Sequence, residues 1–111
     1  MGTPAEVERK KLSVVVPVYF NEASLRPLFA ELERIERELD RRGFDLELIF
    51  VDDGSKDGSL AVLRELKAGR PATRIVKLTR NFGAVQASKT GMRFVTGDCF
   101  LVIAADLQDP P

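Results

Sequence analysis

Runs of hydrophobic residues along this chain alternate with segments in which hydrophobic residues recur at helical spacing. Residues 12–18 are almost continuously apolar and rich in valine, which is typical of a strand buried on both faces of a parallel sheet. In residues 23–42, apolar side chains recur every three or four positions, which predicts an amphipathic helix. Gly43 follows, at the place where a helix C-terminus is expected.

The same alternation continues through the rest of the chain. Further strands are predicted at residues 46–51, 74–79 and 99–104, with helices between them at about 57–68 and 84–96. A strand–helix repeat that ends on a fourth strand favours parallel pairing with right-handed crossovers. The sequence therefore predicts an α/β fold in which residues 12–111 form one domain behind a flexible lead-in at residues 1–11.

Composition narrows the possible functions. Lysine plus arginine and aspartate plus glutamate both total 17, so the chain as a whole has no basic excess for a nucleic-acid backbone. There is no histidine, which excludes Ser–His and Cys–His catalytic pairs. No apolar run reaches the roughly 18–20 residues that cross a bilayer, and no signal-peptide core is present. Cys99, the single cysteine, is interpreted as a buried core thiol in a reducing, cytoplasmic compartment.

Acidic side chains follow three of the predicted strands at the point where each strand ends. Glu22 follows the first strand, Asp52 and Asp53 the second, and Asp106 and Asp109 the fourth. The carboxyl ends of parallel strands form the rim where ligands bind in open sheets. Because gathered carboxylates are costly without a cation or a hydrogen-bonding ligand, the pattern predicts a ligand site at this rim.

Most of these residues also have a purely structural interpretation. Asp53 could shape the turn after its strand, and Glu22 could occupy the first turn of the next helix. Asn81 could cap a helix, and Tyr19 could pack rather than stack on a ligand. For Asp52 a binding role is favoured, because it directly ends an apolar strand as the ribose-reading acid does in nucleotide folds.

The loop at residues 106–111 is the hardest to interpret as structure alone. Its polar groups alternate, which places Asp106 and Gln108 on the same side, and two prolines follow. No glycine follows the first strand, so neither a Rossmann dinucleotide motif nor a Walker loop is present. A bound nucleotide would instead need a divalent cation between the acids and its phosphates, and oxygen ligands favour Mg²⁺ or Mn²⁺.

Four segments taken in order, at residues 17–22, 51–55, 80–83 and 105–111, resemble the motifs of the family 2 glycosyltransferases. Within that family the resemblance is greatest to the dolichyl- and undecaprenyl-phosphate sugar transferases, and it covers nearly all of residues 12–111. It implies a three-layer α/β/α fold with a mainly parallel sheet, the nucleotide-binding half of a GT-A, Rossmann-like fold. It also implies metal-dependent, inverting transfer of a sugar from a UDP- or GDP-sugar to a polyprenyl phosphate in cell envelope glycan synthesis.

The resemblance also implies roles for individual residues. Asp106 would be catalytic and would hold the metal together with Gln108, and Asp52 would read the nucleobase side of the nucleoside. The implied nucleotide-binding set is Pro17, Tyr19, Glu22, Asp52, Asp53, Arg80 and Asp106. Two departures from the family pattern stand out: Ala104 replaces an expected carboxylate, and Phe20 is one extra residue in the first motif.

Two other function classes remain open from the sequence. The chain could be a nucleotide-binding module without transferase activity of its own, because the acceptor half would lie beyond residue 111 in a longer protein at the cytoplasmic membrane face. A phosphoacceptor signalling domain is disfavoured, since its paired acids normally follow the first strand, which here ends in 17–19. A sheet edge left uncovered in a truncated chain would also favour a homo-oligomer.

Overall fold

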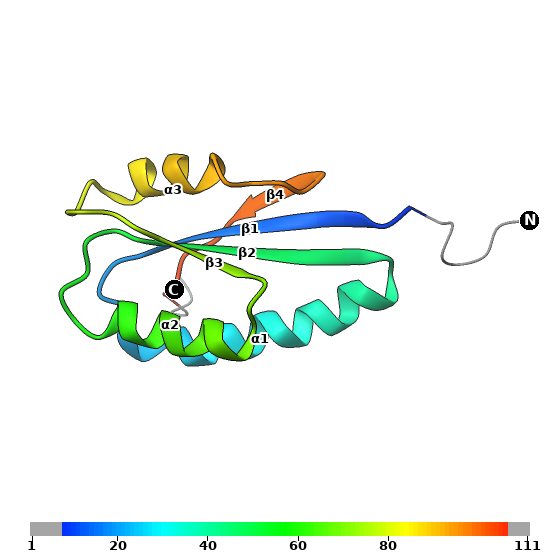
Figure 1. Cartoon of the computed structure of the whole chain (residues 1–111), viewed down its shortest axis with the longest axis horizontal. Helices are drawn as coiled ribbons and strands as arrows, with labels where there is room; N and C mark the ends of the chain where they lie inside the picture. The colour runs from blue at the N-terminus through cyan, green and yellow to red at the C-terminus, as the bar shows by residue number, and fades with distance from the viewer. Residues whose placement is uncertain (1–7, 107–111) are drawn as a thin grey trace, which may run out of the picture.

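The computed structural model describes residues 8–106 as a parallel sheet with helices on both faces (Figure 1). The predicted order of strands and helices is confirmed, and the predicted lead-in falls largely on residues 1–7, which lie outside the described residues. The elements in order are β1 (Lys10–Val18), α1 (Glu22–Arg41), β2 (Phe44–Asp52), α2 (Ser59–Gly69), β3 (Thr73–Lys77), α3 (Ala84–Met92) and β4 (Cys99–Val102).

The strands pair in the order β3-β2-β1-β4, and every pairing is parallel. Asp52 at the end of β2 lies opposite Val18 in β1 and Lys77 in β3. Because β1, β2 and β3 end level with one another, the loops that follow them meet at one edge of the sheet. This register creates the rim on which the functional residues were predicted.

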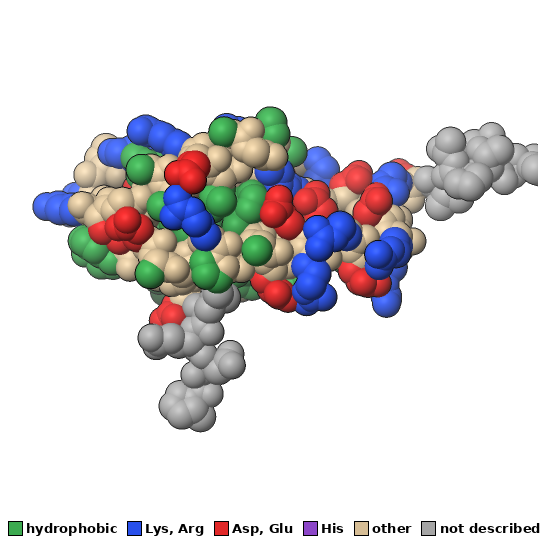
Figure 2. Space-filling model, turned by 90° about the horizontal axis from the view of Figure 1, so that it is seen from below, with side chains coloured by type: hydrophobic (Ala, Val, Ile, Leu, Met, Phe, Trp, Pro, Cys, Tyr) green, Lys and Arg blue, Asp and Glu red, His purple; other side chains and the backbone are tan. Residues whose placement is uncertain are grey.

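Two hydrophobic layers hold the helices on the sheet. On one face, α1 and α2 bury Val16, Leu25 and Phe50, and the rings of Phe29 and Phe50 stack with centroids 6.1 Å apart. Acidic and basic side chains are mixed on the outer surface of this face (Figure 2). On the other face, α3 covers a smaller layer, to which Val15, Ile49, Val51 and Ala87 contribute. The arrangement is therefore three-layered. Burial of each valine, leucine or isoleucine side chain in these layers contributes about 1.5–3 kcal/mol.

Helix α3 ends at Met92, so the prediction that it continues to about residue 96 is wrong. The chain instead turns inward, and Phe94 packs against the layer under α3. Glu47 accepts a hydrogen bond from the backbone N–H of Thr96 at 3.0 Å, and the N–H of Gly97 donates to Ser13 Oγ at 2.9 Å. These partners on β1 and β2 stabilise a turn where the sequence alone favoured more helix.

Strand β4 lies at one edge of the sheet, paired only with β1 among the described residues, and all four of its residues are exposed. Cys99 is exposed too, so the interpretation of a buried core thiol is wrong. The reason is position, because an edge strand has a neighbour on one side only. The expected uncovered apolar surface is present at Phe100, Leu101 and Val102. Within residues 8–106, no helix is long and apolar enough to span a membrane.

Candidate functional site

A cavity of about 340 Å³ opens at the carboxyl ends of the strands, between the loops that follow β1, β2, β3 and β4. Four residues of the predicted set line it, namely Pro17, Tyr19, Asp53 and Asp106. Asn21, Asn81 and Ala104 are also in its wall. The structure thus brings side chains from four separate motifs to one cavity, while Glu22, Asp52 and Arg80 are not part of its lining.

The carboxylate of Asp53 is buried and holds the loop that begins α3. It accepts hydrogen bonds from the backbone N–H groups of Phe82 at 2.8 Å and Gly83 at 3.1 Å. The side-chain amide of Asn81 donates to it at 2.9 Å. Three donors around one carboxylate are a strong arrangement, since hydrogen bonds to an ionised acceptor are stronger than neutral ones. Asp53 therefore shapes the cavity wall through residues 81–83, which supports its structural interpretation.

Gly54 allows the turn after β2 to pack closely against the loop after β3. Its φ of +77° lies in the left-handed region, and a Cβ there would lie 2.6 Å from the backbone atoms Arg80 C and Asn81 N. Both the conformation and the close approach require glycine at this position. The turn after β2 and the loop after β3 consequently form one rigid unit beneath the cavity.

Glu22 ties α1 to α2 instead of facing the cavity. It is the first residue of α1, and its Oε1 accepts a hydrogen bond from the backbone N–H of Gly58 at 2.9 Å. In return, Asp57 Oδ2 accepts from the backbone N–H of Glu22 at 3.4 Å. Each carboxylate therefore lies at the positive end of the other helix. This geometry supports the helix-terminus interpretation of Glu22 rather than contact with the ribose.

Asp52 is also buried, with 1% of the residue exposed. Its Oδ1 accepts a hydrogen bond from the N–H of Ser55 at 3.2 Å, and its backbone carbonyl accepts from Leu78 at 2.9 Å. Arg80 is exposed beside the cavity, and its guanidinium lies 4.3 Å from the centroid of the Phe82 ring. The roles predicted for Asp52 and Arg80 in nucleotide binding stay predictions.

Tyr19 and the extra residue Phe20 form an exposed aromatic pair at the rim. Their rings meet edge to face with centroids 4.6 Å apart. Phe20 has a φ of +53°, which is unfavourable for a bulky side chain and costs on the order of 1 kcal/mol. Its N–H donates to Ser55 Oγ at 3.0 Å, and Asn21 Oδ1 accepts from the N–H of Tyr19 at 2.8 Å. The additional residue is accommodated in a bend after β1, in which the backbone N–H groups of Tyr19 and Phe20 both have acceptors.

The donors predicted for a metal are only partly within the described residues. Asp106 lines the cavity, whereas Gln108 and Asp109 lie outside residues 8–106. In the part of the chain that the structure describes, no three acidic or cysteine side chains come together as a ready metal site. Ala104, at the position of the expected second carboxylate, lines the same cavity.

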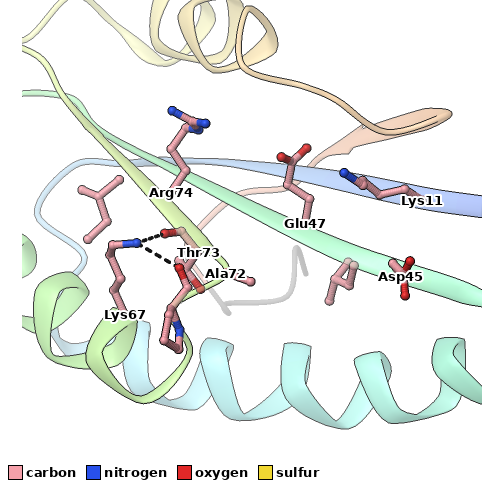
Figure 3. Close-up of a pocket in the computed structure, with 10 residues that line it drawn as sticks. Lys11, Asp45, Glu47, Lys67, Ala72, Thr73 and Arg74 are labelled. Carbon is pink, nitrogen blue, oxygen red and sulfur yellow. Dashed lines mark hydrogen bonds between the residues drawn. The ribbon is translucent and has the colours of Figure 1, made fainter.

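A larger cavity of about 640 Å³ lies at the other end of the sheet, near the start of β3 (Figure 3). Two of the charged groups in its wall have hydrogen-bond partners within the protein. Lys67 donates to the backbone carbonyls of Pro71 at 3.0 Å and Thr73 at 2.6 Å. Glu47 accepts from Ser13 and Thr96. None of the four motifs reaches this cavity, so the smaller one is the candidate site.

The sequence profile of Glycosyl transferase family 2 matches residues 13–111. The chain belongs to this family. It is 41% identical over 99 residues to the uncharacterized glycosyltransferase YkcC of Bacillus subtilis. It is 42% identical over 102 residues to the undecaprenyl-phosphate 4-deoxy-4-formamido-L-arabinose transferase of Edwardsiella ictaluri. These alignments cover 89% and 90% of this chain but only 30% of each relative.

Solved glycosyltransferases share the fold. The mannosyltransferase PcManGT from Pyrobaculum calidifontis, in complex with GDP-Man and Mn²⁺, superposes with a TM-score of 0.74 at 27% identity, covering 90% of this chain and 28% of that protein. TarS from S. aureus superposes with a TM-score of 0.70 at 22% identity over 86% of this chain and 27% of TarS residues 1–349, which supports the fold alone. The predicted GT-A fold is confirmed, and membership of a glycosyltransferase family argues against a phosphoacceptor signalling domain.

Proposed function

We propose that this family 2 chain binds the nucleotide-sugar donor of an inverting transferase that delivers a sugar to a polyprenyl phosphate. The observation that carries the proposal is the cavity at the carboxyl ends of the strands, where Tyr19, Asn81 and Asp106 meet from three loops. Relatives named as undecaprenyl-phosphate and bactoprenol transferases support the lipid-phosphate acceptor. The donor would be a UDP- or GDP-sugar, and the GDP-Man in PcManGT supports a nucleotide-sugar in this fold.

The residues at the cavity offer the oxygen donors that a hard divalent cation prefers. Asp106 offers carboxylate oxygens at the cavity, and Gln108 would add an amide oxygen, which is the donor chemistry that Mg²⁺ and Mn²⁺ prefer. When bound, such an ion would neutralise negative charge on the diphosphate. The Mn²⁺ in PcManGT supports this assignment. Asp106 is therefore the proposed metal ligand and the residue on which transfer depends most.

Catalysis would depend mainly on positioning the lipid phosphate and the donor sugar relative to each other. An oxygen of the lipid phosphate attacks the anomeric carbon, the bond from that carbon to the nucleoside diphosphate breaks, and the configuration inverts. A phosphate monoester is already largely anionic near neutral pH, since its second pKa is about 6. A strong general base is therefore unnecessary. Tyr19, exposed at the rim, would contact the nucleoside, while the loop fixed by Asp53 gives the cavity a preformed wall.

The test is a thermal-shift panel on the 111-residue chain with UDP, GDP and their sugars, with and without Mn²⁺. We expect one nucleotide to raise the unfolding temperature in the presence of Mn²⁺. Asp106→Ala should abolish that shift, whereas Glu65→Ala, which removes an exposed carboxylate of α2, should retain it. An equal shift in Asp106→Ala would overturn the metal role, and no shift with any nucleotide would overturn donor binding.

The binding-module alternative concerns what the chain does by itself. Because it spans 30% of its relatives, we propose that it binds donor without transferring sugar. Incubation with a radiolabelled UDP- or GDP-sugar and undecaprenyl phosphate should yield no glycolipid. Product formed by the 111-residue chain alone would contradict this proposal and assign it the complete activity.

A further inference from the structure

Basic residues are unevenly distributed along this electrically balanced chain. Residues 66–97 contain seven lysines and arginines and no aspartate or glutamate, although the whole chain has 17 of each sign. The segment comprises the end of α2, β3, the following loop and α3. A single stretch of 32 residues thus carries all of its charge with one sign.

The fold places most of this segment on one side of the molecule. Among the described elements, α3 lies over one face of the sheet and β3 is an edge strand, while α1 and α2 lie on the opposite face (Figure 1). That opposite face mixes both signs of charge (Figure 2). Several arginines there pair with acids, as in Arg26–Glu65 and Arg41–Glu38. The two faces therefore differ in their electrostatic character.

Two of the seven basic side chains are used internally. Arg70 is buried against Glu36, and Lys67 donates to backbone carbonyls. The other five are exposed, and no ion pair within residues 8–106 involves them: Arg74, Lys77, Arg80, Lys89 and Arg93. Arg74 and Arg80 lie over the rings of Phe94 and Phe82, and none of the five charges is neutralised by a described acidic side chain.

The outer face of α3 combines these charges with exposed apolar side chains. One face of the helix carries four of these side chains, because the other three each lie three or four residues from Lys89: Val85, Lys89, Met92 and Arg93. Val85 is 72% exposed and Met92 is 41% exposed. The opposite side of α3 faces the sheet through Ala87 and Gly91, so the exposed apolar groups are not part of the core.

We propose that the exposed face of α3, formed by Val85, Lys89, Met92 and Arg93, docks on an anionic lipid bilayer. Interleaved basic and apolar side chains are typical of helices that lie in a membrane interface. Each lysine or arginine near an anionic membrane contributes about 1 kcal/mol. The aliphatic groups of Val85 and Met92 would enter the acyl boundary but have nothing to offer a nucleic-acid phosphate, which favours lipid over a soluble polyanion.

The surface adjoins the candidate site. Gly83 and Ala84 line the cavity, and Ala84 is the first residue of α3. A membrane in contact with α3 would therefore lie beside the cavity mouth, where a lipid phosphate would have to arrive. This last step rests on the proposed function, whereas docking on the bilayer stands on the charge and exposure of the surface itself.

Vesicle co-sedimentation of the 111-residue chain tests the proposal. We expect binding to phosphatidylcholine vesicles that contain phosphatidylglycerol, weak binding to phosphatidylcholine alone, and loss of binding as salt is raised. The double variant Lys89→Glu/Arg93→Glu should lower the partition coefficient at least about tenfold. Its matched control is Arg37→Glu/Arg64→Glu, which makes the same charge change at exposed positions of α1 and α2 and should bind as the unmodified chain does.

Other outcomes separate the alternatives. Val85→Ser should weaken vesicle binding severalfold without changing the charge. Binding that is equal for both lipid compositions and unaffected by salt would overturn the proposal and assign the interaction to the apolar strand β4. Equally tight binding of a single-stranded oligonucleotide, with no effect of Val85→Ser, would replace lipid with a soluble polyanion. The nucleotide-dependent thermal shift of the α3 variants should be unchanged, so failure of docking is distinguishable from failure of donor binding.

Discussion

The carboxylate of Asp53, just after β2, accepts a hydrogen bond from the backbone N–H of Phe82, just before α3, at 2.8 Å. Gly83 N–H and the Asn81 side chain donate to the same carboxylate. A single buried acid thereby fixes the loop that forms one wall of the candidate site. Its effect on a ligand is exerted through that loop.

Asp53→Asn should therefore both destabilise the chain and weaken nucleotide binding. The side-chain NH₂ of asparagine would face one or two of the three donors and could not accept their hydrogen bonds. We therefore expect the free energy of unfolding to fall by about 2–3 kcal/mol. Asp52→Asn is the matched control, because within residues 8–106 the carboxylate of that buried neighbour accepts a hydrogen bond from the N–H of Ser55 alone, and its loss should cost about 1 kcal/mol. Urea denaturation measures both, and equal losses would contradict the assignment.

Arg70 gives a second prediction, which concerns stability alone. Its buried guanidinium donates to both oxygens of Glu36, to Leu46 O at 2.6 Å and to Ala72 O at 2.8 Å. Leu46 lies where β2 extends beyond the start of β3, so the arginine takes the place of a missing strand. Arg70→Ala should lower the free energy of unfolding by about 3–5 kcal/mol, because Glu36 and two carbonyls lose their donor.

Glu36→Gln is the informative partner of that variant. The glutamate side chain is 35% exposed, so water replaces part of the interaction, and Arg70 keeps its carbonyl partners. The expected loss is about 1 kcal/mol. If both variants cost the same in urea denaturation, the ion pair rather than the backbone contacts would account for the role of Arg70.

The order of the elements was predictable because valine-rich runs and helical spacing are local properties of the sequence. The cavity at the carboxyl ends was predictable from that order, because the loops that follow parallel strands meet at one edge of the sheet. The hydrogen-bond partner of each acidic side chain was not predictable. Asp53 and Glu22 find backbone partners 29 and 36 residues away in the chain, in Phe82 and Gly58. No local pattern distinguishes such a bond from contact with a ligand.

Two further features could not be predicted from the sequence, namely the exposure of Cys99 and the basic surface near α3. Cys99 lies in a strand-like run, but burial depends on whether the strand is central or at an edge, which the pattern does not encode. The balanced total charge also concealed residues 66–97, which contain no acidic side chain. Only the fold shows that Lys89 in α3 and Arg93 at its C-terminus lie on the exposed side of that helix.

Gly91 provides a test of how closely α3 packs on the sheet. A Cβ at this position would lie 2.5 Å from Val15 Cγ1 and 2.8 Å from Val51 Cγ2. Gly91→Ala should lower the free energy of unfolding by about 1–3 kcal/mol through overpacking, despite the better helix propensity of alanine. Gly69→Ala, where nothing lies within 4 Å of the added Cβ, should instead stabilise by about 0.4–1 kcal/mol.

Glu47 predicts how stability depends on pH. Burial raises the pKa of Glu47, but the hydrogen bonds from Ser13 and Thr96 outweigh burial and hold it below the usual glutamate value. A carboxyl whose pKa is lower in the folded state stabilises that state when ionised, so its contribution is present above the unfolded pKa of about 4.3 and is lost as pH falls further.

Glu47→Gln isolates this contribution, because the amide oxygen can still accept the bonds from Ser13 Oγ and the Thr96 N–H. The unmodified chain should unfold at a higher temperature than the variant near neutral pH, and the difference should shrink as pH falls below about 4.3, where the glutamate becomes protonated. Thermal unfolding across that range measures it. A difference that stays constant with pH would show that Glu47 acts through packing and neutral hydrogen bonds rather than through its charge.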